Sequence, residues 1–263
     1  MSKMRKILIM CIFLTILTGC FPVFNWQGSD ENKTGEGKSM LKDIAYRNKT
    51  QDSDSYTVYI QEKGAFEPFL VLSSDYEGGI LLLRKFLLED LISYSDSKSY
   101  GSKGGYYPKS NIDYYLNNNY ILQFSQTLQN KILDTNVSVS TLESVDGGGS
   151  VKDTEKIQRK IFILSASEMN IKSGMANNEG KPLAYYKDNE DLKATYKNGV
   201  AEAYWLRTAY LWDDIQAWTV GADGVIGGSS VSEAYAIRPA FCLPKDTLIR
   251  KTELNGKTVY VVE

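Results

Sequence analysis

The sequence contains no histidine among its 263 residues. Histidine is the usual base in Ser-His-Asp and Cys-His catalysis, so both of these mechanisms are excluded. Its absence also removes the commonest protein ligand of zinc and iron. We therefore expect no cofactor and no histidine-based metal centre.

Long hydrophobic runs are also lacking, apart from a short one at the start of the chain. Residues 7–17 are apolar except for one threonine, which is shorter than the roughly 20 residues of a membrane-spanning helix. With the basic residues at positions 3, 5 and 6, this run predicts a secretory signal peptide over residues 1–19. The sequence Leu-Thr-Gly-Cys at 17–20 resembles a bacterial lipobox, in which Cys20 is acylated. The alternative is an ordinary signal peptide followed by a chance cysteine.

Acylation of Cys20 would place the rest of the chain outside the cytoplasm, lipid-anchored to the outer face of the bacterial cell membrane. Of the three cysteines, Cys11 leaves with the signal peptide and Cys20 carries lipid, so Cys242 stands alone. No intramolecular disulfide can then form, and burial of a core must supply the stability.

An excess of basic residues is absent too. The chain has 30 lysines and arginines against 32 acidic residues, and the signal peptide carries three of the basic ones. A chain with more acid than base gives no reason to expect a nucleic-acid partner.

Two regions follow the signal peptide. Residues 20–54 are polar, with little apolar periodicity, and predict a flexible tether after the lipidated cysteine. Residues 55–263 read as a single α+β domain, an antiparallel sheet with two early helices. The strands and hairpins are predicted from β-branched and aromatic runs around glycine turns at residues 57–60, 68–74, 80–83, 203–208, 217–228, 234–243 and 247–263.

The two helices are predicted from capping serines and apolar spacing. Ser110 precedes a helix whose apolar residues recur at i, i+3, i+4 and i+8, and Ser125 precedes a second helix. Ser165 and Glu168 have the spacing of a capping box, so this serine is better explained as a cap than as a nucleophile. Residues 137–144 predict an edge strand, and residues 170–199 a long surface loop with one helical piece.

The order of several short motifs resembles a known pattern. YWLRT at 204–208, GADGVIGG at 221–228 and YAIRPAF at 235–241 resemble the WLRS…DG…GVRPA pattern of a bacterial domain of unknown function, family six-two-seven-three. Upstream pieces fit in order over most of residues 57–243. The closing pattern also resembles C-type-lectin-like and formylglycine-generating-enzyme-like folds, which implies a lectin-like architecture. The enzyme branch needs a cysteine pair and the calcium-dependent lectin branch needs motifs that this chain lacks.

Within these motifs, three residues are interpreted as parts of the interior. Trp205 and Arg207 share one face of their strand, which suits either a ligand platform or a core tryptophan beside a paired arginine. The core interpretation is favoured because tryptophan is highly buried on average. Arg238, next to a proline, is interpreted as bracing a loop through bidentate hydrogen bonds.

Ligand contacts are expected in the loops. Trp212 has Asp213 and Asp214 beside it, which makes full burial improbable and makes Trp212 the best candidate for an exposed aromatic contact. Asp213 and Asp214 are candidate ligand-binding residues beside it. Tyr106 and Tyr107 end a glycine- and tyrosine-rich loop over residues 99–108 and are further candidates. The two aspartates together with Asp223 could hold calcium, although the EF-hand spacing is absent, and we predict no metal.

Three functions remain open at this point. The first is a lipid-anchored, non-catalytic binding module for an extracellular glycan or protein. The second is an extracellular enzyme that acts on cell-wall or glycan substrates with carboxylates, which requires an acidic cleft with a carboxyl group of raised pKa. The third is a structural envelope protein with a flat apolar patch.

Overall fold

The computed structural model describes residues 38–96, 104–147 and 152–263. The predicted signal peptide and Cys20 lie outside these residues. The described residues form one compact unit. Within the described ranges, every helix is too short or too polar to cross a membrane.

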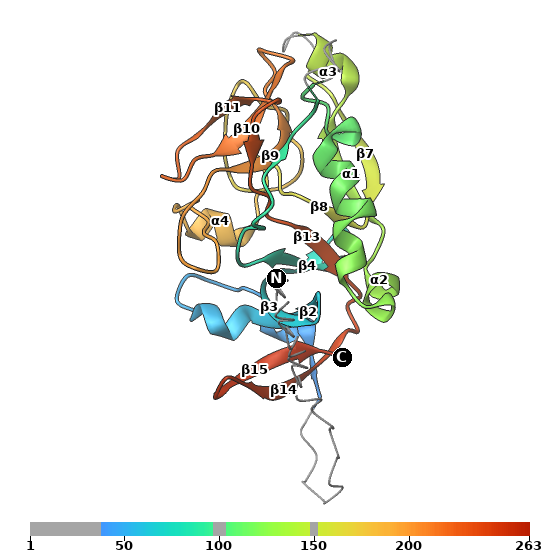
Figure 1. The fold of residues 1–263 in the computed structure, drawn as a ribbon, viewed down its shortest axis with the longest axis vertical. Coiled ribbons are helices and arrows are strands. Elements are labelled where there is room, and N and C mark those ends of the chain that lie inside the picture. Colours follow the sequence, from blue (N-terminus) through green and yellow to red (C-terminus); the bar gives the residue numbers. More distant parts are fainter. Residues whose placement is uncertain (1–37, 97–103, 148–151) are drawn as a thin grey trace, which may run out of the picture. The chain divides into compact units, whose positions relative to one another are not determined.

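The fold is α+β, as predicted, and is dominated by one sheet of eight strands (Figure 1). All neighbours in this sheet are antiparallel except β15 and β2, which are parallel, so the sheet is mixed rather than purely antiparallel. In spatial order its strands are β1 (Ser39–Met40), β14 (Leu248–Leu254), β15 (Lys257–Val262), β2 (Thr57–Glu62), β3 (Ala65–Tyr76), β4 (Gly79–Arg84), β13 (Ala240–Leu243) and β8 (Ile161–Phe162).

Two predicted hairpins of this sheet are confirmed. Glu77 and Gly78 join β3 to β4 with φ angles of 47° and 90°, and Asn255 and Gly256 join β14 to β15 with φ angles of 51° and 75°. Two successive positive φ angles are the mark of a tight turn whose twist matches that of the paired strands. Glycine and asparagine tolerate this conformation best, which is why the sequence revealed the turns.

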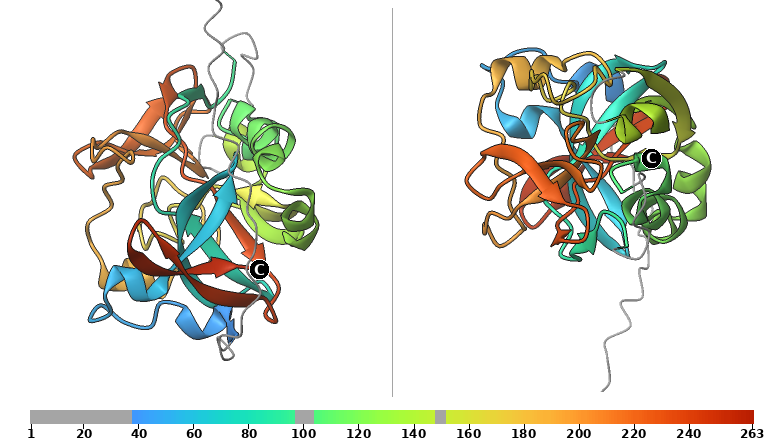
Figure 2. Two further views of the ribbon diagram at one scale, coloured as in Figure 1. Left: turned by 60° about the horizontal axis from the view of Figure 1, so that its bottom comes forward. Right: turned by 90° about the horizontal axis from the view of Figure 1, so that it is seen from above.

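The other strands of the described residues form three smaller sheets, and Figure 2 shows the domain in two further views. The predicted single strand over residues 234–243 is wrong, because it is divided between two sheets. Pro239 lies between the two pieces, has no N–H to donate, and instead accepts a hydrogen bond from Arg84 N through its carbonyl. The smaller sheets are β9 (Tyr204–Ala209) with β10 (Gln216–Val220) and β11 (Ile226–Ser230), β5 (Ile92–Ser93) with β12 (Ala234–Tyr235), and β6 (Thr135–Ser140) with β7 (Thr154–Arg159).

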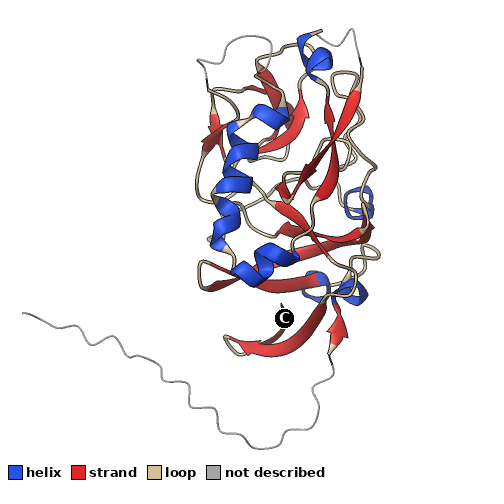
Figure 3. Ribbon diagram, turned by 90° about the vertical axis from the view of Figure 1, so that its right-hand side faces the viewer, coloured by secondary structure: helices blue, strands red, loops and turns tan. Residues whose placement is uncertain are grey.

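The helices are short, and the two predicted from serine caps are confirmed. Ser110 accepts a hydrogen bond from Asp113 N at the start of α1 (Asn111–Asn118), and Ser125 accepts one from Leu128 N at the start of α2 (Gln126–Lys131). These helices follow one another along one side of the strands (Figure 3). The other helical segments are α3 (Leu142–Asp146), α4 (Ala184–Asp188), η1 (Leu41–Ile44), η2 (Ser53–Tyr56), η4 (Tyr107–Lys109) and η5 (Tyr120–Gln123).

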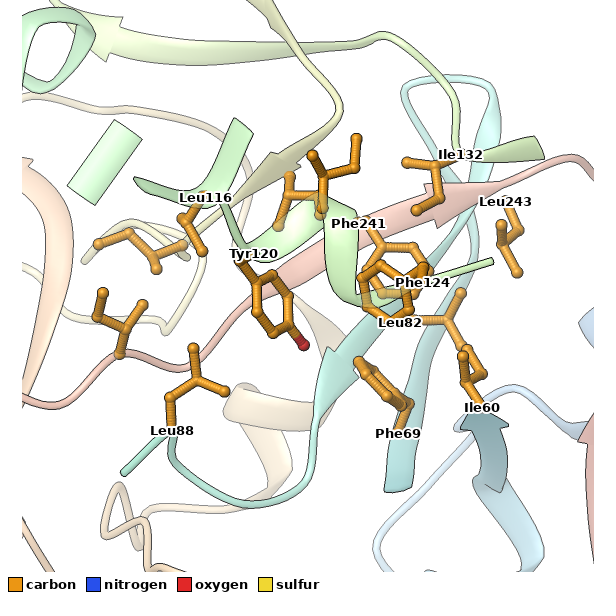
Figure 4. Packing of buried hydrophobic residues seen from close by; sticks show 14 of the residues in the cluster. Ile60, Phe69, Leu82, Leu88, Leu116, Tyr120, Phe124, Ile132, Phe241 and Leu243 are labelled. Atoms are coloured by element: carbon orange, nitrogen blue, oxygen red, sulfur yellow. The ribbon is translucent and has the colours of Figure 1, made fainter. Parts of the chain in front are cut away.

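The main core lies between these helices and the large sheet. Tyr120 meets Phe124 edge to face at 5.3 Å, and Phe69 meets Phe241 in the same way at 5.3 Å (Figure 4). All four side chains are buried. Each fully buried aromatic ring contributes about 1.5–3 kcal/mol, so this cluster is a main source of the stability of the domain.

The flexible tether was predicted over residues 20–54, but the described part of this stretch is folded. Ser39 and Met40 pair with β14, and Leu41 is completely buried. Tyr46 is also buried and donates a hydrogen bond from its hydroxyl to Asp188. Residues 39–54 therefore belong to the folded domain, although their polar composition suggested otherwise.

Candidate functional site

Strand β9 carries the WLR motif through the interior, and both of its faces are buried. Arg207 is 1% exposed, and each nitrogen of its guanidinium donates a hydrogen bond. Nε donates to Ser138 O, Nη1 to Ile163 O and Glu168 Oε2, and Nη2 to Glu168 Oε1 and Glu179 O, all at 2.7–2.9 Å. With every donor occupied, Arg207 has none left for a ligand.

Glu168 is the acidic partner and reaches Arg207 from a tight turn. Ser165 N donates to Glu168 Oε2, and Glu168 N donates to Ser165 Oγ, which is the reciprocal pattern of a capping box. The capping box predicted from the spacing of Ser165 and Glu168 is thus present. The helix start that it implied is wrong, because the residues after Ser165 form turns and no helix. The box instead orients Glu168, whose Oε1 also accepts a hydrogen bond from Tyr76.

Glu179 extends this network into the loop over residues 170–183, and the sequence did not identify it. Its Oε1 accepts from Ser140 N and Oγ at 2.8 and 2.6 Å, and its Oε2 accepts from Thr208 Oγ1 at 2.7 Å. Asn177, also buried, donates to Ser140 Oγ at 3.1 Å. A lone acid in a polar stretch carries no periodic signal, so sequence reasoning had no means of finding this anchor.

Burial and pairing determine the charges in this network. Burial alone lowers the pKa of Arg207, but the charge of Glu168 raises it overall. Burial raises the pKa of Glu179, and the charge of Arg207 offsets part of that rise. A buried ion pair whose oxygens and N–H groups are all bonded holds the strands and the loop together. The arrangement is that of a structural brace.

Trp205 and Arg238 are interior as well. Trp205 is fully buried, donates from Nε1 to Ile92 O at 2.9 Å and meets Tyr94 edge to face at 5.2 Å. Arg238 is 8% exposed, and its guanidinium donates to the carbonyls of Arg84 and Lys85 at 3.0 and 3.2 Å. Both residues lie where the sequence interpretation put them, in the core and as a brace.

The loop between β9 and β10 contrasts with this interior. Its Trp212 is 64% exposed. The turn is held by Asp213, whose Oδ1 accepts from Ile215 N at 3.1 Å and whose Oδ2 accepts from Gln216 Nε2 at 3.0 Å. Asp213 N in turn donates to Tyr210 O. Asp213 thus fixes the loop that presents Trp212, instead of offering a free carboxylate.

A second segment supports the same loop. Asp214 accepts a hydrogen bond from Gly105 N through its carbonyl at 2.9 Å. Any Cβ at Gly105 would come within 2.7 Å of Gln216 O, so this position needs glycine. The Trp212 loop is therefore fixed from two sides.

The two tyrosine candidates differ. Tyr106 is half-buried and its hydroxyl donates to Glu155 Oε1 at 2.7 Å. Tyr107 is 1% exposed and belongs to the main core, so the prediction that it faces a ligand is wrong. The reason is that η4 turns this ring inward just before α1. Residues 99–103 of the predicted tyrosine-rich loop lie outside the described residues.

The three aspartates considered for calcium do not meet. Asp223 lies in the turn beyond the far end of β10, where its Oδ1 accepts from Val225 N. The five residues of β10 lie between Asp223 and the other two aspartates, and a strand of this length spans about 16 Å. Within the described ranges, no group of three acidic or cysteine residues could hold a metal ion.

Comparison with known proteins gives one result. The sequence profile of the domain of unknown function DUF6273 matches residues 77–245. The matched stretch contains Arg207, Glu168 and Glu179, the Trp212 loop and α1, and leaves β2, β14 and β15 outside it. No curated protein and no solved structure matches the chain, so a C-type-lectin-like architecture stays a prediction.

Proposed function

The chain belongs to the DUF6273 family, and from this premise we propose that it is a non-catalytic binding module for an extracytoplasmic glycan, held at the outer face of the membrane by lipid on Cys20. The observation that carries the proposal is the exposure of Trp212 on a fixed loop. Neither the fold nor the family description names a ligand, so the proposal is argued from this site.

The energetics of the exposed Trp212 side chain favour a role in contacting a ligand. An indole is one of the largest apolar side chains, and leaving it in water forgoes the stabilisation that burial would contribute. The loop is already ordered by Asp213 and by Gly105. A ligand that covers the ring therefore gains apolar contact with little further cost of ordering the loop.

The Trp212 site favours a glycan over a protein. It consists of one exposed ring, bordered by the half-buried side chains of Asp213 and Asp214. A sugar ring offers a small apolar face surrounded by hydroxyl groups, which matches a single aromatic ring with polar neighbours. A protein interface would call for a wider apolar area.

The alternative of an enzyme that uses carboxylates has little support. Among the described residues, the pKa of one aspartate and one glutamate is raised, and neither is free to act on a substrate. Burial raises the pKa of Asp113 and of Glu179. Glu179 is inaccessible, and both oxygens of Asp113 accept hydrogen bonds from Arg159. A carboxyl group bonded in this way cannot exchange a proton freely with a bound substrate.

Ligand screening of the purified full-length chain in detergent tests the binding role. We expect binding on a glycan array that disappears in Trp212→Ala and persists in Val225→Ala, a control at a comparably exposed apolar residue. Binding that survives Trp212→Ala contradicts the proposed site. Protein partners in a pull-down, without any signal on the glycan array, would show that the ligand is a protein and not a glycan. Turnover of a substrate would contradict a non-catalytic role.

Metabolic labelling with palmitate tests the anchor separately. We expect label in the wild-type chain and none in Cys20→Ser, with the wild type in the membrane fraction. Label that persists in Cys20→Ser, or an unlabelled wild type, would contradict the lipid anchor without affecting the glycan proposal.

A further inference from the structure

A groove lies between α1 and β7. Its volume is about 490 Å³, within the range of small-molecule sites in proteins. Pro108, Lys109 and Ser110 form one end, and the other lining residues come from α1, from Ile121 in η5, from Asp134 just before β6, and from the end of β7 with the adjacent Lys160.

The floor of the groove is rigid. Asp113 on α1 is 5% exposed and accepts three hydrogen bonds from Arg159 on β7, at 2.7, 2.9 and 2.8 Å. Asn117 on the same helix bonds the backbone of Ile161 through both ends of its amide, donating at 2.9 Å and accepting at 3.1 Å. These bonds fix α1 against the strand, so the groove is formed before any ligand arrives.

The rim of the groove combines an aromatic ring with groups that bind hydroxyls. Tyr114 is 67% exposed, and Asn118 and Gln158 are exposed beside it. Amide side chains both donate and accept hydrogen bonds, which suits a ligand rich in hydroxyl groups. This combination is what a saccharide requires.

The charge of the groove is opposite to that of the whole chain. Arg159 is neutralised by Asp113, which leaves Lys109, Lys160 and the exposed Asp134 as the other charged residues of the lining. Among the described residues, neither lysine has an acidic partner, and Lys160 only donates to Gln129 O. The groove thus carries an excess of positive charge on a chain with more acidic than basic residues.

One short segment joins this groove to the Trp212 loop. Gly105 bonds the backbone of Asp214, and Lys109 follows four residues later. Four residues span at most about 14 Å. The backbone that supports the Trp212 loop therefore lies within about 14 Å of Lys109, a distance that a short oligosaccharide can span.

We infer that the groove between α1 and β7 is a second subsite of the same glycan-binding surface, and that it binds the anionic group of an acidic saccharide, a carboxylate or a phosphate. The inference rests on the proposed function for the nature of the ligand. Lys109 and Lys160 attract the anion, the ring of Tyr114 contacts the sugar, and the amides bind its hydroxyls.

Matched saccharide probes test this subsite in the full-length protein. Binding is measured by calorimetry to an oligogalacturonate, to its methyl-esterified neutral form, and to a malto-oligosaccharide that carries a phosphate monoester. We expect one or both anionic probes to bind at least about tenfold more tightly than the neutral one, and the stronger of the two identifies the anionic group. Their affinity falls with added salt, because charge contacts near the surface are screened.

Two lysine variants separate the groove from the rest of the surface. Lys109→Gln with Lys160→Gln is expected to lower the affinity for the anionic probe about tenfold and to leave the neutral probe unchanged. The control, Lys42→Gln with Lys187→Gln, removes two exposed lysines outside the groove and should change neither. Urea unfolding of both double variants verifies that they remain folded.

The outcomes distinguish this inference from the proposed function. Binding that depends on Trp212 but not on the charge of the probe or on the two groove lysines overturns the subsite and leaves the glycan-binding role standing. A chain that binds none of the three probes, and no glycan on the array, overturns both.

Discussion

Arg207 lies in the YWLRT motif and Trp212 lies five positions later, in the loop that follows the motif, yet their surroundings are opposite. Arg207 is 1% exposed, with each guanidinium nitrogen bonded within the domain. Trp212 is 64% exposed, on a loop that is itself held by Asp213 and Gly105. The polar, charged residue is inside and the large apolar residue is outside.

This inversion separates the role of the motif from that of the loop after it. Burying a charge is costly unless it is fully paired, so Arg207 is best explained as the brace that joins β9, Glu168 and the loop of Glu179. Exposing an indole on a rigid turn is unfavourable for the isolated domain, so Trp212 is best explained by a ligand. The motif WLRT therefore reports the fold, and the loop after it is where function is expected.

The largest effect is expected from breaking the brace. Arg207→Met should lower the free energy of unfolding by about 3–5 kcal/mol, because Glu168 is left as an unpaired buried charge. Urea unfolding followed by circular dichroism measures the loss. A second variant with Glu168→Leu in addition should recover part of it, since no buried charge then remains unpaired. A loss below about 1 kcal/mol would show that the pair behaves like an exposed one.

A smaller loss is expected at the next residue of β9. Thr208 Oγ1 accepts from Ala166 N and donates to Glu179. Thr208→Val should cost about 1–3 kcal/mol, because both partners are left unsatisfied in the interior. Thr208→Ser keeps the hydroxyl and should cost only about 1 kcal/mol for the lost methyl group. Equal losses in the two variants would contradict the role assigned to the hydroxyl.

A still smaller change is expected in the loop that carries Trp212. Asp213→Ala removes the acceptor for Ile215 N and Gln216 Nε2, and should cost about 1 kcal/mol. Glycan affinity should fall with it, because the indole is then presented by a looser turn. Asp223→Ala, which breaks the equivalent bond in the turn after β10, is the control and should leave the affinity unchanged.

Much of the fold was predictable because its signals are local. Asn255-Gly256 indicated a hairpin because these two residue types tolerate the positive φ angles of a tight turn. Ser110 and Ser125 indicated helix starts because serine caps helix N-termini. The burial of Trp205 followed from its size and strand position. These features depend on a few neighbouring residues, and the sequence displays such neighbours directly.

Features that depend on distant partners were missed. Leu41 and Tyr46 lie in a polar stretch, and only pairing with β14 and contact with Asp188 bring them into the domain. Glu179 is an isolated acid until Ser140 and Thr208 surround it. The groove between α1 and β7 was not found for the same reason, since Asp113 and Arg159 are 46 positions apart.

The most direct test of the account is the comparison of stability with binding in Trp212→Ala. An exposed side chain that makes no hydrogen bond should change the free energy of unfolding by no more than about 0.5 kcal/mol. We predict that this variant unfolds like the wild type in urea and no longer binds the glycan that the wild type binds on the array. A variant that binds as well as the wild type would contradict the account.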